Sequence, residues 1–371
     1  MVCKTSISLP VAPLPPARIV LVQMVRKPDR PLRRGWTTGA CATAATRAAL
    51  MGLWGEGRPN KVRITLPGGE RPVFELAHWK QGYDWVEAGI IKDAGDDPDV
   101  THGALVKARV SASEGGVTFK AGDGIGEVTM PGLPIAPGEP AINPVPRTMM
   151  SQTVSEMAAR LGESPDINIE ISIPGGADIA LKTWNPRLGI KGGLSILGTT
   201  GIVRPFSCAA WIASIHRGID VAREAKLPHV AGCTGATSEK TVQHLYSLPD
   251  HAMLDMGDFA GGLLKYLAKH PIPRITIGGG IGKMTKLAQG ARDLHSARSQ
   301  VDFKALAAVM EKPEIQDMNT ALQAFEETGE KMALWVAQNS QATVRKMLPD
   351  EIACDTVVID RQGNIIASTG A

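Results

Sequence analysis

The stretch Ala88-Gly-Ile-Ile-Lys-Asp-Ala-Gly-Asp-Asp-Pro-Asp-Val-Thr-His-Gly103 joins an apolar segment to a strongly acidic loop. Residues 86–91 are mostly apolar, which predicts a buried strand. The loop that follows carries four aspartates, Asp93, Asp96, Asp97 and Asp99. Carboxylates this close repel one another, so we expect other groups to neutralise them or a ligand to use them.

The acidic loop has two other interpretations. A solvated turn is one, because Asp, Gly and Pro are ordinary turn formers. A calcium loop is the other, and it would need carboxylates at alternating positions, a glycine at the sixth and a glutamate at the twelfth. Counted from Asp93, the third position is Gly95, so the calcium pattern fails. Because functional loops commonly follow rigid strands, a functional role stays open beside the plain turn.

A second segment that attracts attention is Arg34-Gly-Trp-Thr-Thr-Gly-Ala-Cys41. It leads into an alanine-rich run, residues 40–50, and alanine is the best helix former. Thr37 or Thr38 can cap the start of this helix. The first-turn amides of a helix bind anions well, and arginines precede them here. The segment therefore predicts a capped helix with an anion site at its start.

Four ordered segments together resemble the CbiD family of cobalamin biosynthesis. They are residues 34–41, 92–103, Gly138-Glu-Pro-Ala-Ile-Asn-Pro-Val-Pro-Arg147 and Gly192-Gly-Leu-Ser-Ile-Leu-Gly-Thr-Thr-Gly-Ile-Val203. The resemblance runs from about Leu32 to the C-terminus. It implies a cobalt-precorrin-5B (C-1)-methyltransferase, which uses S-adenosyl-L-methionine and gives cobalt-precorrin-6A. It also implies that cobalt arrives with the substrate, so no metal site is expected in the protein.

The resemblance implies an anionic tetrapyrrole substrate but assigns no catalytic residue. Basic and hydroxyl side chains on loops are expected to hold the substrate's carboxylates; the candidates are Arg34, Thr37, Thr38, Lys92, Arg147, Lys191 and Arg204. Three groups of the acidic loop are candidates for the catalytic centre, near the sulfonium or as a base; they are Asp93, Asp96 and His102. The expected cofactor loop is Gly198, Thr199, Thr200 and Gly201, where glycines admit a ligand to backbone amides.

The first half of the chain predicts an α+β domain over residues 32–186. Alternating apolar residues at 62–66 and 73–76 flank Pro-Gly-Gly and predict a hairpin. Residues 169–173 and 179–182 flank another Pro-Gly-Gly. Each hairpin follows a helical stretch, at 40–50 and at about 146–161. We therefore expect a duplicated helix-hairpin unit in this half.

The second half predicts a Rossmann-like parallel α/β domain over residues 187–371. Strand, glycine turn and helix follow one another from residues 194, 230, 252 and 275, which is typical of an open parallel sheet. Residues 356–359 and 364–367 predict a closing hairpin. Ligands of such sheets bind at the carboxyl ends of the strands. The glycines at 278–282 match neither the Walker A nor the dinucleotide pattern, because position 283 is Lys and 284 is Met.

Composition narrows the functional classes. The chain has 371 residues, of which 43% are hydrophobic and 21% charged, as in globular proteins. A net charge of +3 and an aromatic content of 4% argue against nucleic acid binding. Five cysteines without C-x-x-C spacing argue against a disulfide framework or zinc and favour the cytoplasm.

The N-terminal residues and two other functions complete the expectations. Residues 1–31 are rich in proline and predict a flexible tail, in which Met24 is an alternative start. The apolar run at residues 19–22 is too short for a membrane span, so no membrane partner is expected. A nucleotide- or NAD-dependent enzyme and a non-catalytic tetrapyrrole-binding protein stay open as alternatives, as does a homo-oligomer.

Overall fold

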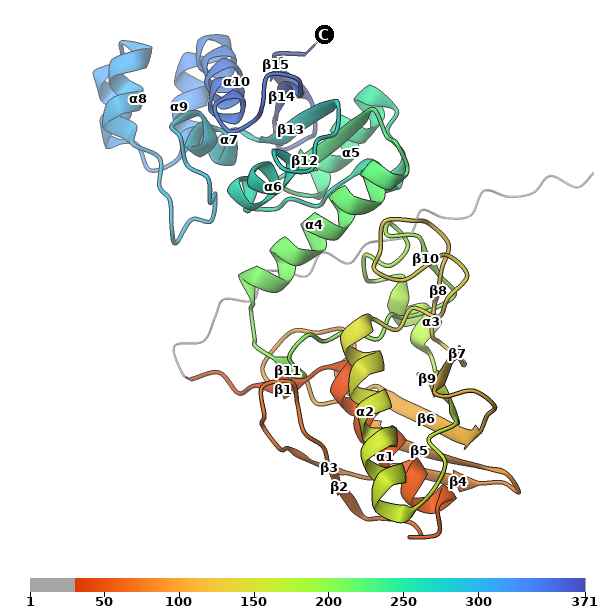
Figure 1. Cartoon of the computed structure of the whole chain (residues 1–371). Coiled ribbons are helices and arrows are strands. Elements are labelled where there is room, and N and C mark those ends of the chain that lie inside the picture. Colours follow the sequence, from red (N-terminus) through yellow and green to blue (C-terminus); the bar gives the residue numbers. More distant parts are fainter. Residues whose placement is uncertain (1–30, 371) are drawn as a thin grey trace, which may run out of the picture.

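The computed structural model describes residues 31–370, and Figure 1 shows the two halves of the chain as separate lobes. The first half lies in the lower part of the view, and the second half lies above it. Helix α4 (Cys208–Glu224) leads from one to the other. The expected tail and the alternative start at Met24 fall outside the described residues, apart from Pro31. Within the described range, no helix has both the length and the apolar character that crossing a membrane requires.

The first half contains a five-stranded sheet in the order β4-β5-β6-β9-β7. Neighbouring strands are antiparallel, except that β7 runs parallel to β9. The strands predicted at residues 86–91, which lead into the acidic loop, and at 169–173 are confirmed, whereas β4 was not predicted. The strand bounds of this sheet are His78–Gln81 (β4), Trp85–Ile91 (β5), Leu105–Ala112 (β6), Thr118–Ala121 (β7) and Ile167–Ser172 (β9).

Two helices contribute to the core of the first half, and both were predicted. Helix α1 (Thr38–Leu53) begins where the Thr37 hydroxyl accepts a hydrogen bond from the Ala40 amide. It is buried along most of its length, because its alanines let it pack closely on β5 and β6. Helix α2 (Pro144–Leu161) packs on α1 and ends at Gly162, which is left-handed.

The prediction of a duplicated helix-hairpin unit is wrong, because the second hairpin does not form. The first hairpin exists as β2 (Lys61–Arg63) and β3 (Val73–Glu75). After β9, however, the chain forms helix α3 (Gly176–Ala180) instead of a returning strand. A Cβ at Gly176 would lie 2.3 Å from the Gly124 carbonyl oxygen, so this turn is pressed against the backbone of another loop. That tertiary contact decides the conformation, and the local sequence does not carry it.

The segment 194–197 was expected as the first strand of the parallel sheet, and this prediction is also wrong. Leu194 and Ile196 form isolated bridges with Ile125 and Ile142, and both pack in the core of the first half. The next residues form β11 (Ile202–Val203), which pairs with β1 (Gly35–Trp36). We therefore propose that the domain boundary lies at about residues 204–207 rather than 187.

The second half contains a four-stranded sheet in the order β12-β13-β14-β15. The first three strands are parallel, and β15 is antiparallel to β14, which confirms the closing hairpin. The strand expected at 252–254 is reduced to one parallel bridge between Met253 and Ala231. The strand bounds are His229–Cys233 (β12), Arg274–Gly280 (β13), Ala353–Ile359 (β14) and Ile365–Ser368 (β15).

Helices cover both faces of this sheet. Helix α5 lies on the face that carries Cys233 and Val357, while α7 and α10 pack with the residues of the opposite face. The α/β class with parallel strands is thus confirmed, and the Rossmann-like topology stays a proposal. The helix bounds are Ala236–Tyr246 (α5), Ala260–Leu267 (α6), Ile281–Ala288 (α7), Phe303–Met310 (α8), Ala321–Thr328 (α9) and Glu330–Arg345 (α10). Short strands β8 (Glu127–Val128) and β10 (Ile190–Lys191) pair with each other in the first half.

Candidate functional site

Backbone hydrogen bonds bring the four segments of the sequence analysis together. The Trp36 amide donates to the Asp93 carbonyl at 2.7 Å, and the Thr37 amide donates to the Gly201 carbonyl at 3.0 Å. The Asn143 amide, at the start of α2, donates to the Ile196 carbonyl at 3.0 Å. Segments that are far apart in the chain therefore form one region around the start of α1.

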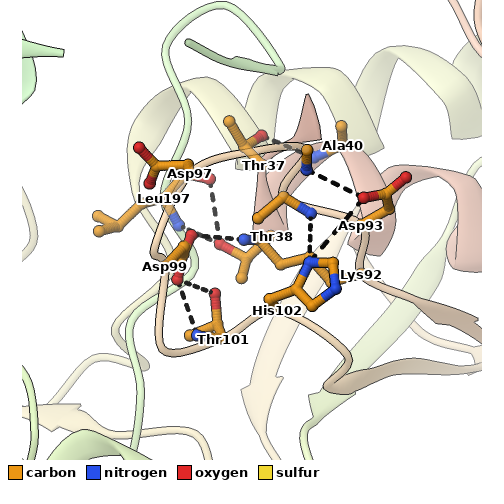
Figure 2. A network of polar contacts seen from close by, with 12 residues as sticks. Thr37, Thr38, Ala40, Lys92, Asp93, Asp97, Asp99, Thr101, His102 and Leu197 are labelled. Atoms are coloured by element: carbon orange, nitrogen blue, oxygen red, sulfur yellow. Dashed lines mark hydrogen bonds and ion pairs between the residues drawn. The ribbon is translucent and has the colours of Figure 1, made fainter. Parts of the chain in front are cut away.

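The first-turn amides of α1 already donate hydrogen bonds to acceptors of the protein itself. In Figure 2 the Thr38 side chain lies against Leu197, whose amide donates to the Thr38 hydroxyl at 3.0 Å. The Gly39 amide donates to the Leu197 carbonyl at 2.9 Å, and the Ala40 amide donates to Thr37 Oγ1 at 3.2 Å. Thr37 and Thr38 thus hold the 197–201 loop in this structure, and their contact with substrate stays a prediction.

The structure contradicts the expectation that Lys92 lies on an exposed substrate rim. Its side chain is only 1% exposed, and Nζ pairs with Asp99 Oδ2 at 2.5 Å. Asp99 also accepts hydrogen bonds from the amide and hydroxyl of Thr101. Burial alone would raise the pKa of Asp99, but Lys92 and Thr101 together lower it. The pair explains how a lysine can follow an apolar strand into the protein.

Asp93 and Asp96 are both held by Arg33, which the sequence analysis did not select. The Arg33 guanidinium forms an ion pair with the Asp93 carboxylate, and the Arg33 amide donates to Asp96 Oδ2 at 2.8 Å. This guanidinium is the main cause that lowers the pKa of Asp93 to about 2, and the Gly95 amide adds to the effect. Asp93 is therefore ionised at neutral pH and is a poor general base.

His102 closes onto the acidic loop. Its Nδ1 accepts a hydrogen bond from the Ala94 amide at 3.1 Å and lies 3.9 Å from Asp93 Oδ1 (Figure 2). Because Nδ1 is an acceptor, the neutral ring carries its proton on Nε2. The side chain is 53% exposed, and no hydrogen bond to Nε2 forms within the described residues. The Nε2–H group is thus able to donate to a ligand.

The fourth aspartate, Asp97, connects the acidic loop to the segment that leads into α4. Its Oδ1 accepts a hydrogen bond from the Phe206 amide at 2.8 Å. Phe206 has a left-handed φ of 57°, so this contact fixes an unusual backbone turn just before the second half begins. Burial raises the pKa of Asp97, and the Phe206 amide opposes that rise.

The expected basic residues fall into two groups. Strands β1 and β11 pair Gly35 with Val203, and continuing this antiparallel register places Arg34 opposite Arg204. Both are exposed, and neither forms an ion pair within residues 31–370. Arg147 and Lys191 lie elsewhere, near β8. Arg147 donates to Glu139 and to the carbonyls of residues 140 and 142, while Lys191 pairs in register with Glu127.

The expected cofactor loop does not lie at the carboxyl end of a strand in the parallel sheet. A Cβ at Gly198 would lie 2.2 Å from Thr37 Oγ1, and one at Gly201 would lie 2.6 Å from Leu66 Cδ2. Gly201 also has a φ of 81°. These glycines are thus required by the protein's own packing, and the reason for assigning them to the cofactor is lost. Thr199 and Thr200 are exposed.

Comparisons with known proteins identify the family of this chain. The CbiD family model matches residues 25–205, and the model described as CbiD, C-terminal domain, matches residues 293–370. A protein of Paramagnetospirillum magneticum named cobalt-precorrin-5B C(1)-methyltransferase is 55% identical over 350 residues, which cover 91% of this chain and 98% of that protein. The chain belongs to the CbiD family.

Other relatives extend the match. A Brucella anthropi protein with the same name is 58% identical over 91% of this chain and 95% of its own length. A Bradyrhizobium protein, also of that name, is 54% identical over 91% of this chain and 94% of its own. A crystal structure described as cobalamin biosynthesis protein (cbiD) from Archaeoglobus fulgidus is 24% identical, with a TM-score of 0.39, and covers 80% of this chain and 85% of that one.

Arg33 and Asp99 are the residues of this CbiD region that sequence reasoning missed. The repulsion among four aspartates was itself a signal that cations must lie near them. The sequence offered Lys92 as one such cation, but it was assigned to substrate. Arg33 precedes Arg34 in the chain, and the local sequence does not distinguish which of the two faces the loop.

We expect Lys92→Met to lower the free energy of unfolding by about 3–5 kcal/mol, because it leaves Asp99 without its buried partner. The double variant Lys92→Met/Asp99→Asn should recover part of this loss. Lys61→Met is the matched control, since it removes the exposed ion pair with Glu75 and should change stability very little. Urea denaturation measures all three. Equal stability of the Lys92 and Lys61 variants would contradict a structural role for the buried pair.

We expect Gly201→Val to destabilise the fold by about 1–3 kcal/mol from backbone strain, with a further cost from the contact with Leu66. Gly55→Val is the control, because Gly55 has a φ of 83° with nothing within 4 Å of its Cβ position. Thermal melts should give the larger loss for Gly201. The folded fraction should bind S-adenosylhomocysteine normally in calorimetric titration. Lost binding with an unchanged melting temperature would return the cofactor to this loop.

Proposed function

We propose that this chain methylates carbon 1 of cobalt-precorrin-5B, with S-adenosyl-L-methionine as the methyl donor, and so forms cobalt-precorrin-6A in cobalamin biosynthesis. The observation that carries the proposal is the identity of 54–58% to relatives named cobalt-precorrin-5B C(1)-methyltransferase over 91% of this chain. The cobalt belongs to the substrate. The expected cytoplasmic location is part of the proposal, and the unpaired state of the four described cysteines supports it.

The donor supplies a methyl group that is already activated on a sulfonium. The chain therefore has to orient the two reactants and exclude water. The closely bonded region around α1 suits an orienting role, because its loops are fixed by backbone contacts to one another. Gly35 and Gly95 illustrate how closely they pack, since a Cβ on either would lie within 2.4 Å of the other segment's backbone.

The exposed pair Arg34 and Arg204 supports binding of the substrate's peripheral carboxylates. Two guanidinium groups on opposite positions of a short ladder repel each other unless an anion lies between them. A carboxylate would receive charged hydrogen bonds there, which are among the stronger ones in proteins. Lys191 and Arg147 belong to a separate region and are proposed as contacts for a more distant carboxylate. Thr37 and Thr38 position the loop that ends next to Arg204.

His102 and Asp96 are proposed as the polar groups that face the reacting ring. The protonated Nε2 of His102 would donate a hydrogen bond to the substrate. Asp93 has a different role in this proposal: its carboxylate stays ionised beside Arg33 and accepts a hydrogen bond from the Gly95 amide, which holds the loop against which His102 lies. A proton lost from the macrocycle would pass to a neighbouring carboxylate or to water.

Incubation with methyl-labelled S-adenosylmethionine and cobalt-precorrin-5B tests the activity. The expected result is one labelled methyl on the tetrapyrrole, seen as the corresponding mass increase, together with S-adenosylhomocysteine. Binding of the tetrapyrrole without methyl transfer would favour the non-catalytic binding protein. Binding of NAD or ATP without S-adenosylhomocysteine would favour the nucleotide-dependent enzyme. Sedimentation of the same protein would test the homo-oligomer.

We expect Arg34→Ala to weaken tetrapyrrole binding by about ten- to a hundred-fold, because it removes a charged hydrogen bond. Affinity for S-adenosylhomocysteine should not change. Arg361→Ala, an exposed arginine in the turn after β14, is the control and should leave both affinities unchanged. Fluorescence or calorimetric titration gives the two constants. A selective loss of cofactor affinity in the Arg34 variant would mean that this residue serves the other ligand.

A further inference from the structure

In the sheet of the second half, the connections that leave β12 and β13 run in opposite directions across the sheet. From β12 the chain passes through α5 to Met253, which bridges Ala231 on the outer side of β12. From β13 it passes through α7 and reaches β14 on the other side. Two neighbouring parallel strands whose connections leave in opposite directions leave a crevice beyond their carboxyl ends. In open α/β sheets this crevice is the place where ligands bind.

Glycines at this crevice differ from those of the 198–201 loop. A Cβ at Gly235, Gly280 or Gly282 would have nothing within 4 Å. Gly235 has a φ of 175° and Gly280 a φ of −71°, so neither needs to be glycine for its backbone conformation. The backbone conformation therefore does not explain why these positions are glycine. Because the space above them is open, a ligand can approach the main-chain amides there.

A carboxylate lies beside the first of these loops. The Leu254 amide donates to the Ala231 carbonyl at 2.9 Å, and the Gly257 amide donates to the Cys233 carbonyl at 3.0 Å. These two bonds hold Asp255 alongside the end of β12. Burial is the main cause that raises the pKa of Asp255 to about 6, and Glu239 adds to it, so the group is still ionised at pH 7.5.

Side chains from the first half close this edge of the sheet. Arg187 forms an ion pair with Glu239 in the first turn of α5, and Trp184 packs edge-on against Trp211 of α4 at 5.5 Å between ring centroids. Trp211 in turn donates from Nε1 to the Asp255 carbonyl at 3.0 Å. The crevice is thus bordered by aromatic rings and by the carboxylates of Asp255 and Glu239. Its cations, Arg187 and Lys283, are paired with Glu239 and Asp258, so the lining suits a nucleoside better than a phosphate-rich ligand.

We propose that the crevice at the carboxyl ends of β12 and β13 binds the adenosyl group of the methyl donor, with Asp255 accepting hydrogen bonds from the ribose hydroxyls. The open glycines Gly235 and Gly280 let the nucleoside approach the backbone. An acidic residue about 20 positions after a glycine turn is the known partner of ribose hydroxyls in dinucleotide-binding folds. Asp255 stands at that spacing from Gly235. This inference rests on the proposed function, because that function supplies the adenosyl ligand.

Calorimetric titration of the full chain with S-adenosylhomocysteine tests the site. Asp255→Asn should weaken binding at least about ten-fold, since a charged hydrogen bond is lost. Asp350→Asn changes an exposed aspartate away from the crevice and should bind normally. Gly235→Val should fold normally, because its φ and surroundings accept a side chain, but it should lose most of the affinity. Thermal melts verify that each variant is folded.

An analogue of S-adenosylhomocysteine without the two ribose hydroxyls assigns the contact. It should bind the unchanged protein at least about ten-fold more weakly than S-adenosylhomocysteine, yet lose nothing further on Asp255→Asn. Normal binding of S-adenosylhomocysteine by both folded variants would overturn the site and leave the proposed function standing. Failure of the unchanged protein to bind S-adenosylhomocysteine would overturn the proposed function together with this site.

Discussion

The buried ion pair between Lys92 and Asp99 is the interaction on which the acidic loop depends. Four carboxylates in one short loop would repel one another, and each has a specific partner here. Lys92 neutralises Asp99 from inside the protein, Arg33 neutralises Asp93 from outside, and the Phe206 amide binds Asp97. Because an unpaired buried charge is costly, the loop can take this shape only when the lysine is in place.

The same contacts determine where the two halves meet. Arg33 stands two residues before β1, and Phe206 stands three residues after β11, so the acidic loop binds both strands at the same end of the antiparallel β1–β11 ladder. The ladder in turn brings Arg34 opposite Arg204. A loop that first suggested a catalytic centre therefore also has a structural role, because it fixes the entry to α1 and the exit toward α4.

The glycine turns of this chain fall into two kinds, which differ in what surrounds the position of a Cβ atom. Gly198 and Gly201 are excluded from carrying a side chain by Thr37 and Leu66, whereas Gly235 and Gly280 face open space. In the sequence, the motifs look alike, since each is a short glycine turn before a helix or strand. Whether a glycine packs against a distant segment or faces open space depends on the tertiary structure, so the sequence alone cannot separate the two kinds. For this reason we propose the second kind of glycine, rather than the first, as the contact of the cofactor.

The sequence by itself determined the elements whose cause is local. The alanine-rich helix after Thr37, the Pro-Gly-Gly hairpin at 67–69, the parallel strands at 230 and 275, and the acidic loop after β5 follow from propensity, periodicity and turn chemistry. The family also followed from the order of four segments. These features depend on residues that are neighbours in the chain, so their physical cause is present in the sequence.

Only the tertiary structure decided which segments share a core and which charges meet. Residues 194–197 have the apolar pattern of a sheet strand, yet they pack in the first core beside Ile142, because burial there satisfies the same pattern. Residues 176–180 form a helix because Gly176 must pass close to Gly124. Lys92 is a cation that could have faced a ligand, and it is instead buried in an ion pair with Asp99. Electrostatic partners and close backbone contacts arise between residues far apart in the chain, so local pattern cannot specify them.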